Sequence, residues 1–341
     1  MHNHYNKLNA EMFLKRAGST PVLDVRSPQE YLHGHIPGAF SLPLFSDEER
    51  AVVGTTYTHQ GKDAAIQKGL EIVGPRLDLF INTALEAAPG KEVLVHCWRG
   101  GMRSEAMAWL LQFAGFKCSL LDGGYKAYRK YTREMFEKGF RLIVLGGMTG
   151  SGKTAVLHRL REQGEQVLDL ESLAHHKGSA FGALGQEDQP TQEQFENDLA
   201  AQWMSLDTEK TVWIEDESRN IGKVIIPDAL FNEMGKSTVV FLEVPFEERV
   251  KRLYEEYGGF EKPELAALIS KISRRMGGDL ALSALNALDK RNIEEAVSIV
   301  LQYYDKTYLY DLSKKSKSLL VRVSYTEFLR GYTEIRGEIE R

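Results

Sequence analysis

The chain has 341 residues, of which 43% are hydrophobic and 27% charged, and its formal net charge is −5 at pH 7. This length predicts two domains, each with its own hydrophobic core. The negative net charge excludes a general attraction to nucleic acid, so any nucleic-acid contact would have to come from local basic patches.

Two cysteines exclude a disulfide framework and a four-cysteine zinc site. The start of the chain, residues 1–8, is polar and lacks the apolar core of a signal peptide. No apolar run approaches the ~20 residues that a membrane-spanning helix needs. We therefore expect a cytoplasmic protein without a membrane partner.

The first half of the chain alternates apolar runs with helical patterns. Strands are expected at residues 20–25 and 116–121, a helix at 75–88, and a polar, charged insertion at 46–68. Strands that alternate with helices predict an α/β domain with a mainly parallel sheet. In such a domain the catalytic loops gather at the carboxyl ends of the strands.

A strand, a tight loop and a helix follow one another between Val93 and Phe113. The apolar strand ends at Cys97, and the helical pattern begins at Ser104. The loop consists of Trp98, Arg99, Gly100, Gly101, Met102 and Arg103, and one face of the helix is expected to hold Ala106, Trp109, Leu110 and Phe113.

This arrangement predicts that Cys97 is a nucleophile in an anion-binding loop. Backbone N–H groups and the dipole at the start of a helix favour anions, and Arg99 and Arg103 add positive charge. Both effects favour the thiolate, which is the reactive form of cysteine. We expect Cys97 and Arg103 to be catalytic. The alternative is an inert core cysteine, but such cysteines do not usually lie in loops rich in glycine and arginine.

Two residues near this loop are expected to have structural roles. His96 should point to the opposite face of the sheet from Cys97, because side chains alternate along a strand, and we expect it to order the loop. Cys118 lies in an apolar strand, where core packing is the expected role.

Further motifs surround the cysteine loop, namely Asp24-Val25-Arg26, Glu30-Tyr31, Gly34-His35-Ile36-Pro37-Gly38-Ala39 and Asp122-Gly123-Gly124. Together they resemble a rhodanese-like domain over residues 6–137. The resemblance implies transfer of sulfur or selenium as a cysteine-bound persulfide or its selenium counterpart. Five residues separate Cys97 from Arg103, whereas sulfurtransferases of this family usually have four. The longer spacing also satisfies the protein tyrosine phosphatase signature, so phosphatase chemistry stays open.

The second half begins with a buried strand at residues 141–146, a glycine-rich loop and a helix that starts at residue 155. Glycines in such a loop let backbone amides surround phosphate oxygens, while Lys153 reaches the outer phosphate and Thr154 can bind Mg²⁺. The phosphate-binding residues are expected to be Gly147, Thr149, Gly150, Ser151, Gly152, Lys153 and Thr154. The pattern predicts a P-loop domain at residues 138–310, followed by a C-terminal extension at 311–341.

Two other stretches of the second half support this domain. A strand at residues 211–217 ends in carboxylates, as at a Walker B position, and Asp216 is the expected partner of Mg²⁺, with Glu215 as the alternative. A helical stripe of Phe195, Leu199, Trp203 and Leu206 is expected to pack in the core. Taken alone, this half also fits a P-loop ATPase or kinase.

A rhodanese-like domain followed by a P-loop domain resembles the bacterial tRNA 2-selenouridine synthase family. The matching stretches are Asp47 to Thr55, Cys97 to Ser104, Gly147 to Thr154, Asp169 to Gly182, Gln189 to Asn197 and Glu215 to Gly222. The resemblance implies a tRNA substrate with 2-thiouridine at the wobble position. It also implies two co-substrates, geranyl diphosphate to alkylate the sulfur and selenophosphate to supply selenium through Cys97. No prosthetic group is implied, and an enzyme that produces selenophosphate is a possible partner.

Local basic residues are the candidates for tRNA contact. Arg129, Lys130 and Arg133 lie in a helical, charged segment at residues 126–138. Further candidates are Arg274, Arg275, Lys314, Lys315 and Lys317. The alternative for each is a solvated surface, which is the commoner role of such charges.

Overall fold

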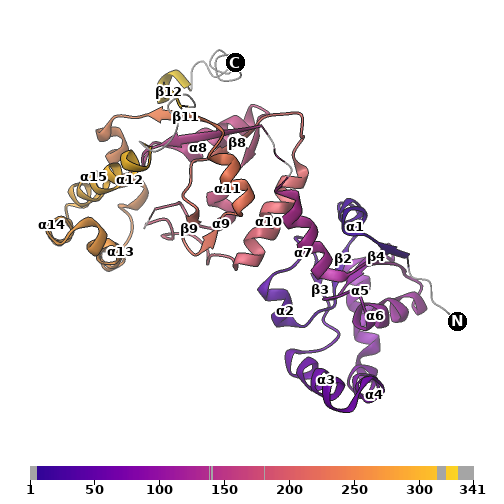
Figure 1. Ribbon diagram of the computed structural model, residues 1–341. Coiled ribbons are helices and arrows are strands. Elements are labelled where there is room, and N and C mark those ends of the chain that lie inside the picture. Colours follow the sequence, from indigo (N-terminus) through magenta and orange to yellow (C-terminus); the bar gives the residue numbers. More distant parts are fainter. Residues whose placement is uncertain (1–5, 138, 140, 180, 313–319, 329–341) are drawn as a thin grey trace. The chain divides into compact units, whose positions relative to one another are not determined.

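The computed structural model describes residues 6–137, 139, 141–179, 181–312 and 320–328 (Figure 1). The chain forms two compact units. The first consists of Met1–Phe136 together with Glu196–Ala201, and the second consists of Glu137–Phe195 together with Gln202–Arg341. The short segment Glu196–Ala201 thus returns to the first unit, which the sequence boundaries did not anticipate.

The first unit contains a five-stranded sheet in which every pair of neighbouring strands is parallel. In sheet order the strands are β1 (Asn6–Leu8), β5 (Lys117–Leu121), β4 (Glu92–His96), β2 (Val22–Asp24) and β3 (Phe40–Ser41). Its helices are α1 (Ala10–Ala17), α2 (Pro28–His33), α3 (Asp47–Gln60), α4 (Lys62–Val73), η1 (Gly74–Arg76), α5 (Leu77–Ala87), α6 (Met102–Phe113) and α7 (Gly124–Met135).

The polar insertion expected at residues 46–68 folds as the helices α3 and α4. A capping box explains where α3 begins: the Ser46 hydroxyl accepts from the Glu49 amide, and the Glu49 carboxylate accepts from the Ser46 amide. These two bonds satisfy backbone donors that the first turn of a helix leaves unpaired.

Helix α6 buries a different face from the one expected. Its buried residues are Ser104, Met107, Ala108, Leu110 and Leu111. Trp109 and Phe113 are 53% and 83% exposed. Of the four residues expected on one face, Leu110 is therefore buried, whereas Trp109 and Phe113 are exposed, because the helix buries Ser104, Met107, Ala108 and Leu111 at helical spacing instead.

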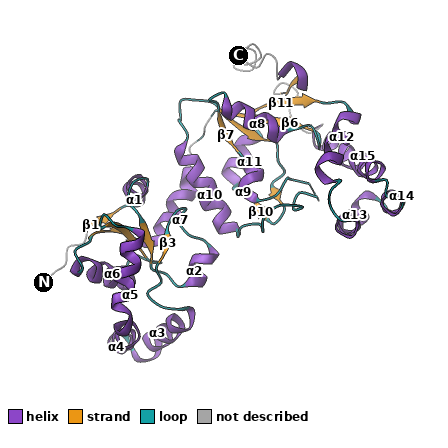
Figure 2. Ribbon diagram, turned by 180° about the vertical axis from the view of Figure 1, so that it is seen from behind, coloured by secondary structure: helices purple, strands orange, loops and turns teal. Residues whose placement is uncertain are grey.

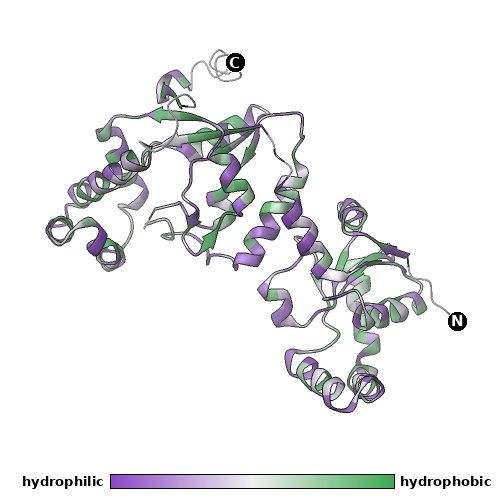
Figure 3. Ribbon diagram, in the orientation of Figure 1, coloured by the Kyte–Doolittle hydropathy of each residue, from purple (hydrophilic) through white to green (hydrophobic). Residues whose placement is uncertain are grey.

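The second unit contains another five-stranded parallel sheet (Figure 2). In sheet order the strands are β12 (Leu320–Ser324), β11 (Thr238–Glu243), β6 (Leu142–Gly147), β8 (Val212–Glu215) and β7 (Gln166–Leu168). A two-stranded antiparallel pair is formed by β9 (Asn220–Ile221) and β10 (Val224–Ile225). The strands of the sheet are mostly hydrophobic (Figure 3), as expected for strands that are buried on both faces.

The stretch expected to be a C-terminal extension adds a strand to this sheet. Strand β12 pairs with β11 from Val239↔Leu320 to Glu243↔Ser324. Phe328, which follows it, packs edge-on against Trp213. Within the stretch that the sequence analysis treated as an extension, residues 320–328 thus pack with the P-loop sheet.

The helices of the second unit form two groups. The sheet is accompanied by α8 (Lys153–Glu162), α9 (Leu170–Ala174) and α11 (Asp228–Met234), and by the two ends of α10 (Gln192–Ser205), whose middle, Glu196–Ala201, belongs to the first unit. A separate helical layer consists of α12 (Phe246–Tyr257), α13 (Lys262–Met276), α14 (Gly278–Asp289) and α15 (Ile293–Leu312), which share a core of their own. In α10 the expected stripe is confirmed for Phe195, Leu199 and Trp203, all nearly fully buried. Among the described helices, none is both long and apolar enough to cross a membrane.

Candidate active sites

The sulfur of Cys97 lies at the first turn of α6. Cys97 directly follows β4 and is only 3% exposed. Its Sγ is 3.2 Å from the hydroxyl oxygen of Ser104 and 3.9 Å from the carbonyl oxygen of Gly101. When the sulfur is ionised, the Ser104 hydroxyl is a donor within its reach. Cys97, the predicted nucleophile, thus lies at the start of a helix and is almost completely buried.

Two glycines hold the cysteine loop against the start of α7. Gly100 has φ +65°, and a Cβ there would lie 2.6 Å from the carbonyl oxygen of Leu121. Gly124 has φ +61°, and a Cβ there would lie 2.3 Å from the backbone nitrogen of Gly100. The amide of Tyr125 donates to the carbonyl oxygen of Cys97 at 2.9 Å. The Asp122-Gly123-Gly124 motif therefore fixes the loop because only glycine allows this approach.

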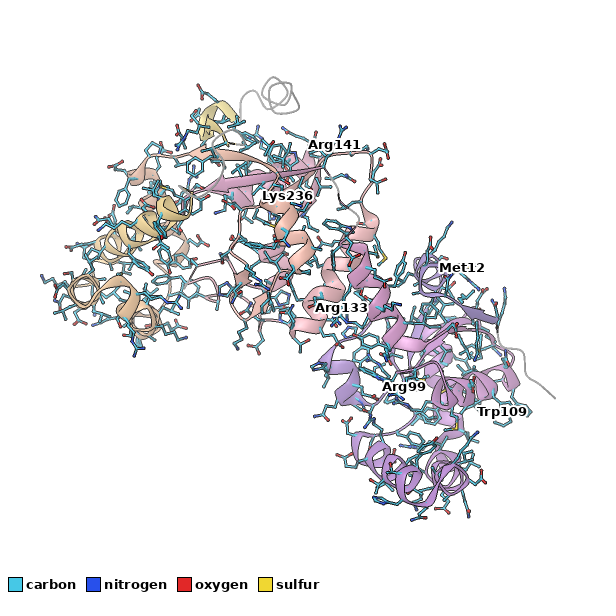
Figure 4. All side chains as sticks on the ribbon, viewed as in Figure 1. Met12, Arg99, Trp109, Arg133, Arg141 and Lys236 are labelled. Carbon is cyan, nitrogen blue, oxygen red and sulfur yellow. The ribbon has the colours of Figure 1, made fainter. Side chains whose placement is uncertain are left out.

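Arg103 is paired with a carboxylate instead of facing the sulfur. Its Nη1 donates to Oε2 of Glu30 at 2.6 Å, and Arg50 lies 3.4 Å from the same oxygen. Burial alone would raise the pKa of Glu30, but the bond from Arg103 holds it below its ordinary value. Arg99, labelled in Figure 4, is exposed on the loop, and Met102 is exposed as well. The expected catalytic role of Arg103 stays a prediction.

His96 lies away from Cys97, as the strand alternation predicted. It is fully buried beside Phe13 and Tyr125, with Nε2 3.6 Å from Oδ2 of Asp24. Burial lowers its pKa, although the Asp24 charge opposes this, which favours the neutral ring. Asp24 is itself paired with the buried guanidinium of Arg26 at 2.6 Å. These residues anchor the strand ends below the loop.

Cys118 is a core residue, as predicted. It is 4% exposed among the apolar side chains that also contact β4. Burial raises the pKa of its thiol to about 12, so the thiolate is disfavoured there.

The P-loop joins β6 to α8 and lines a cleft of about 550 Å³. All seven predicted phosphate-binding residues line this cleft. The Nζ of Lys153 donates to the carbonyl oxygen of Gly147 at 3.2 Å. Two arginines of α12, which the sequence analysis missed, tie the loop backbone: Arg249 donates to the Thr149 carbonyl at 3.2 Å and Arg252 to the Ser151 carbonyl at 2.7 Å. Their spacing of one helical turn was the available signal.

The two candidate Walker B carboxylates have different environments. Glu215 is fully buried, accepts from the Leu170 amide at 2.9 Å, and burial raises its pKa well above the ordinary value. Asp216 lines the cleft and accepts from the Tyr308 hydroxyl at 2.7 Å. Tyr308 in turn accepts from the Gly147 amide at 3.2 Å. Asp216, the first choice for the Mg²⁺ partner, thus lines the cleft, and Glu215, the alternative, does not.

More carboxylates line the cleft than the sequence analysis identified. The Thr154 hydroxyl donates to Oε2 of Glu171 at 2.9 Å. Burial raises the pKa of Glu217 to about 8, although the charge of Lys153 opposes this. Gly178 packs against the same carboxylate, since a Cβ there would lie 2.5 Å from its Oε2.

Mg²⁺ prefers oxygen ligands such as hydroxyl and carboxylate groups. A protein usually supplies one or two of these ligands, and the substrate phosphates supply others. Thr154 and Asp216 fit this pattern. Within the described ranges no group of three or more His, Cys, Asp or Glu side chains could hold a metal ion. A Mg²⁺ ion at this site would therefore take its other ligands from phosphate oxygens and water.

One of the predicted tRNA contacts is wrong. Arg129 is only 6% exposed, because its guanidinium pairs with Glu196 and donates to Oδ1 of Asn197 at 2.6 Å. The side chains of Lys130 and Arg133 are 77% and 66% exposed. Figure 4 labels Arg133 on α7.

The structure describes only some of the remaining candidates for tRNA contact. Arg274 and Arg275 are exposed in the last turn of α13. Lys314, Lys315 and Lys317 lie outside the described residues.

Comparison with known proteins agrees with this architecture. Residues 9–131 match the family model of the rhodanese-like domain, and residues 140–291 match that of the tRNA 2-selenouridine synthase AAA domain. The tRNA 2-selenouridine synthase of Nitrosomonas europaea is 40% identical over 249 residues, which are 70% of this chain and 63% of that protein. The chain thus spans less than two thirds of this relative.

Two solved structures resemble parts of the chain. One is the N-terminal domain of a "putative ATP/GTP binding protein" from Clostridium difficile 630, with 40% identity, 37% of this chain and 98% of that chain covered, and a TM-score of 0.35. The other is a rhodanese-related protein from Thermoplasma volcanium, with 20% identity, 37% and 93% covered, and a TM-score of 0.24. The two family models, in this order, and the Nitrosomonas relative show that the chain belongs to the tRNA 2-selenouridine synthase family.

Proposed function

We propose that the protein is a transferase that converts 2-thiouridine at the wobble position of tRNA into 2-selenouridine in the cytoplasm. It would first geranylate the sulfur and then replace it with selenium from selenophosphate. The observation that carries this proposal is the presence on one chain of two different structural features, a cysteine at the start of a helix and a cleft lined by a P-loop. A phosphatase would use only the first, and an ATPase or kinase only the second.

The P-loop cleft is the proposed site of geranylation. The thiocarbonyl sulfur attacks carbon 1 of geranyl diphosphate, the carbon–oxygen bond breaks, and pyrophosphate leaves with the electron pair. The base loses the proton of N3, for which the carboxylate of Glu171 is the proposed acceptor in the cleft. Lys153 and the loop amides stabilise the charge of the leaving group. Mg²⁺, when held by Thr154 and Asp216, would supply further positive charge to it.

The Cys97 loop is the proposed site of selenation. A selenium nucleophile bonds to carbon 2 of the base, and the geranyl thiol leaves. Alkylation prepares this step, because a thiol leaves more easily than a thiocarbonyl sulfur. In the role that the family resemblance implies, Cys97 carries the selenium as an S–Se species.

The electron count allows a second role for Cys97. Selenium in selenophosphate is fully reduced, so forming an S–Se bond with release of phosphate needs a two-electron acceptor. Transfer of the phosphoryl group needs none: the selenium of selenophosphate bonds to carbon 2, and the Cys97 thiolate then takes the phosphoryl group from selenium. The five residues between Cys97 and Arg103, a phosphatase spacing, favour this role. Mass spectrometry of trapped Cys97 separates the two, because only a selenium adduct has the isotope pattern of selenium.

The experiment that tests the whole proposal is mass spectrometry of nucleosides from 2-thiouridine tRNA incubated with protein, geranyl diphosphate and selenophosphate. We expect Cys97→Ala to accumulate S-geranyl-2-thiouridine without 2-selenouridine, and Cys118→Ala, the matched control in the core, to make both. Lys153→Ala should lose geranylation, whereas Lys236→Ala, an exposed lysine elsewhere on the unit, should keep it (Figure 4). Formation of 2-selenouridine by Cys97→Ala would remove Cys97 from the mechanism.

A further inference from the structure

An apolar cavity lies within the helical layer formed by α12 to α15. Its volume is about 40 Å³, which is room for about three water-sized groups. The side chains around it include Leu265, Ile269, Leu288, Ala296, Val300 and Leu301. Protein cores are normally packed without spaces of this size, since a void forfeits contacts on all of its walls. A cavity that persists beside a functional cleft therefore suggests an occupant.

The cavity adjoins the P-loop cleft. Thr149, Ser179, Leu253, Tyr257 and Tyr304 line both spaces. Thr149 belongs to the P-loop itself, so the apolar space begins where the phosphate cradle ends. The combined space has backbone amides and Lys153 at one end and only hydrocarbon walls at the other.

We infer that the cavity holds the far end of a prenyl chain whose diphosphate lies on the P-loop. The inference rests on the proposed function for the identity of the diphosphate substrate. With the diphosphate on the loop, the first isoprene unit would pass Leu253 and Tyr257, and the terminal carbons of the second would enter the cavity. A nucleotide is disfavoured, because the polar groups of its base and ribose would lose water without gaining hydrogen-bond partners there.

The position of the cavity also predicts selectivity for chain length. A five-carbon dimethylallyl chain would end at the shared wall and leave the cavity empty. A ten-carbon geranyl chain would fill it and gain the free energy of apolar burial. A fifteen-carbon farnesyl chain would exceed the space.

The test uses two alanines of the same core. Ala296 lines the cavity, and Ala287 does not, although both are at most 3% exposed. Isothermal titration would measure the dissociation constants of geranyl diphosphate, dimethylallyl diphosphate and inorganic pyrophosphate. We expect Ala296→Leu to weaken geranyl diphosphate about tenfold or more while pyrophosphate binds as before. Ala287→Leu should bind all three like the wild type.

A cavity-enlarging variant keeps the inference testable if the leucine variants fold poorly. Val300→Ala should bind farnesyl diphosphate more tightly than the wild type does, with unchanged pyrophosphate binding. The inference fails if Ala296→Leu binds geranyl diphosphate like the wild type, or if Val300→Ala leaves the preference for chain length unchanged. It also fails if the wild type binds geranyl diphosphate no more tightly than pyrophosphate. If the chain-length pattern holds but no tRNA is geranylated, the cavity assignment stands and the proposed function fails.

Discussion

At the scale of single residues, the carboxylate of Glu217 predicts how the stability of the protein depends on pH. Its pKa is raised to about 8 by burial, from an ordinary value of 4.5. Between these values the folded protein keeps a proton that the unfolded chain releases. The free energy of unfolding should therefore fall as pH rises from about 5 to 8.

We predict that Glu217→Gln removes part of this pH dependence. The amide cannot titrate, so the melting temperature of the variant should fall less than that of the wild type between pH 5 and pH 8. Thermal unfolding at several pH values would measure this. Glu247→Gln, at an exposed position of α12, is the control and should follow the wild type. Superimposable profiles for Glu217→Gln and the wild type would contradict the assignment.

The residue scale also separates what the sequence can predict from what it cannot. The P-loop motif is local, and all seven of its predicted residues line one cleft because consecutive residues determine the loop. The prediction that Arg129 is an exposed tRNA contact was wrong, because its partners Glu196 and Asn197 come from a segment far along the chain. The apolar cavity could not be predicted from local sequence either, since residues from four helices line it.

At the scale of elements, the cysteine loop and the start of α7 are in close backbone contact. Gly100 and Gly124 approach so closely that neither position has room for a side chain. The motif that the sequence analysis assigned to the rhodanese pattern thus has a physical reason. The burial of α6, in contrast, depended on the shape of the sheet below it, which hydrophobic spacing alone does not contain.

We predict that Gly124→Ala lowers the free energy of unfolding by about 1–3 kcal/mol or more, through strain at positive φ and the clash with Gly100. It should lose selenation and keep geranylation, because the P-loop cleft belongs to the other unit. Denaturant titration and nucleoside mass spectrometry would measure both. Gly54→Ala, in α3 with no atom within 4 Å of the added methyl group, is the control and should stabilise by about 0.5–1 kcal/mol. Equal loss of both activities in Gly124→Ala would argue against separate sites.

At the scale of the whole molecule, each unit has its own core and one of the two proposed sites. Such units can work independently when a shared substrate passes between them. We predict that Cys97→Ala and Lys153→Ala, each unable to make 2-selenouridine alone, make it when mixed. The first variant would supply S-geranyl tRNA and the second would selenate it.

The mixing experiment is followed by nucleoside mass spectrometry over time. A Cys97→Ala, Lys153→Ala double variant mixed with either single variant is the control, and it should yield no 2-selenouridine. If the two single variants together also yield none, while the geranylated intermediate is present, selenation requires tRNA geranylated by the same molecule.

The return of Glu196–Ala201 to the first unit has a consequence for folding during synthesis. A chain emerges from the ribosome N-terminus first, and its domains generally fold as they appear. The guanidinium of Arg129 can bond to Asn197 only after a further 68 residues have been synthesised. The second unit waits longer still, because its edge strand β12 comes from residues 320–324. Neither unit can complete its packing early, so the nascent chain exposes unfinished cores through much of translation.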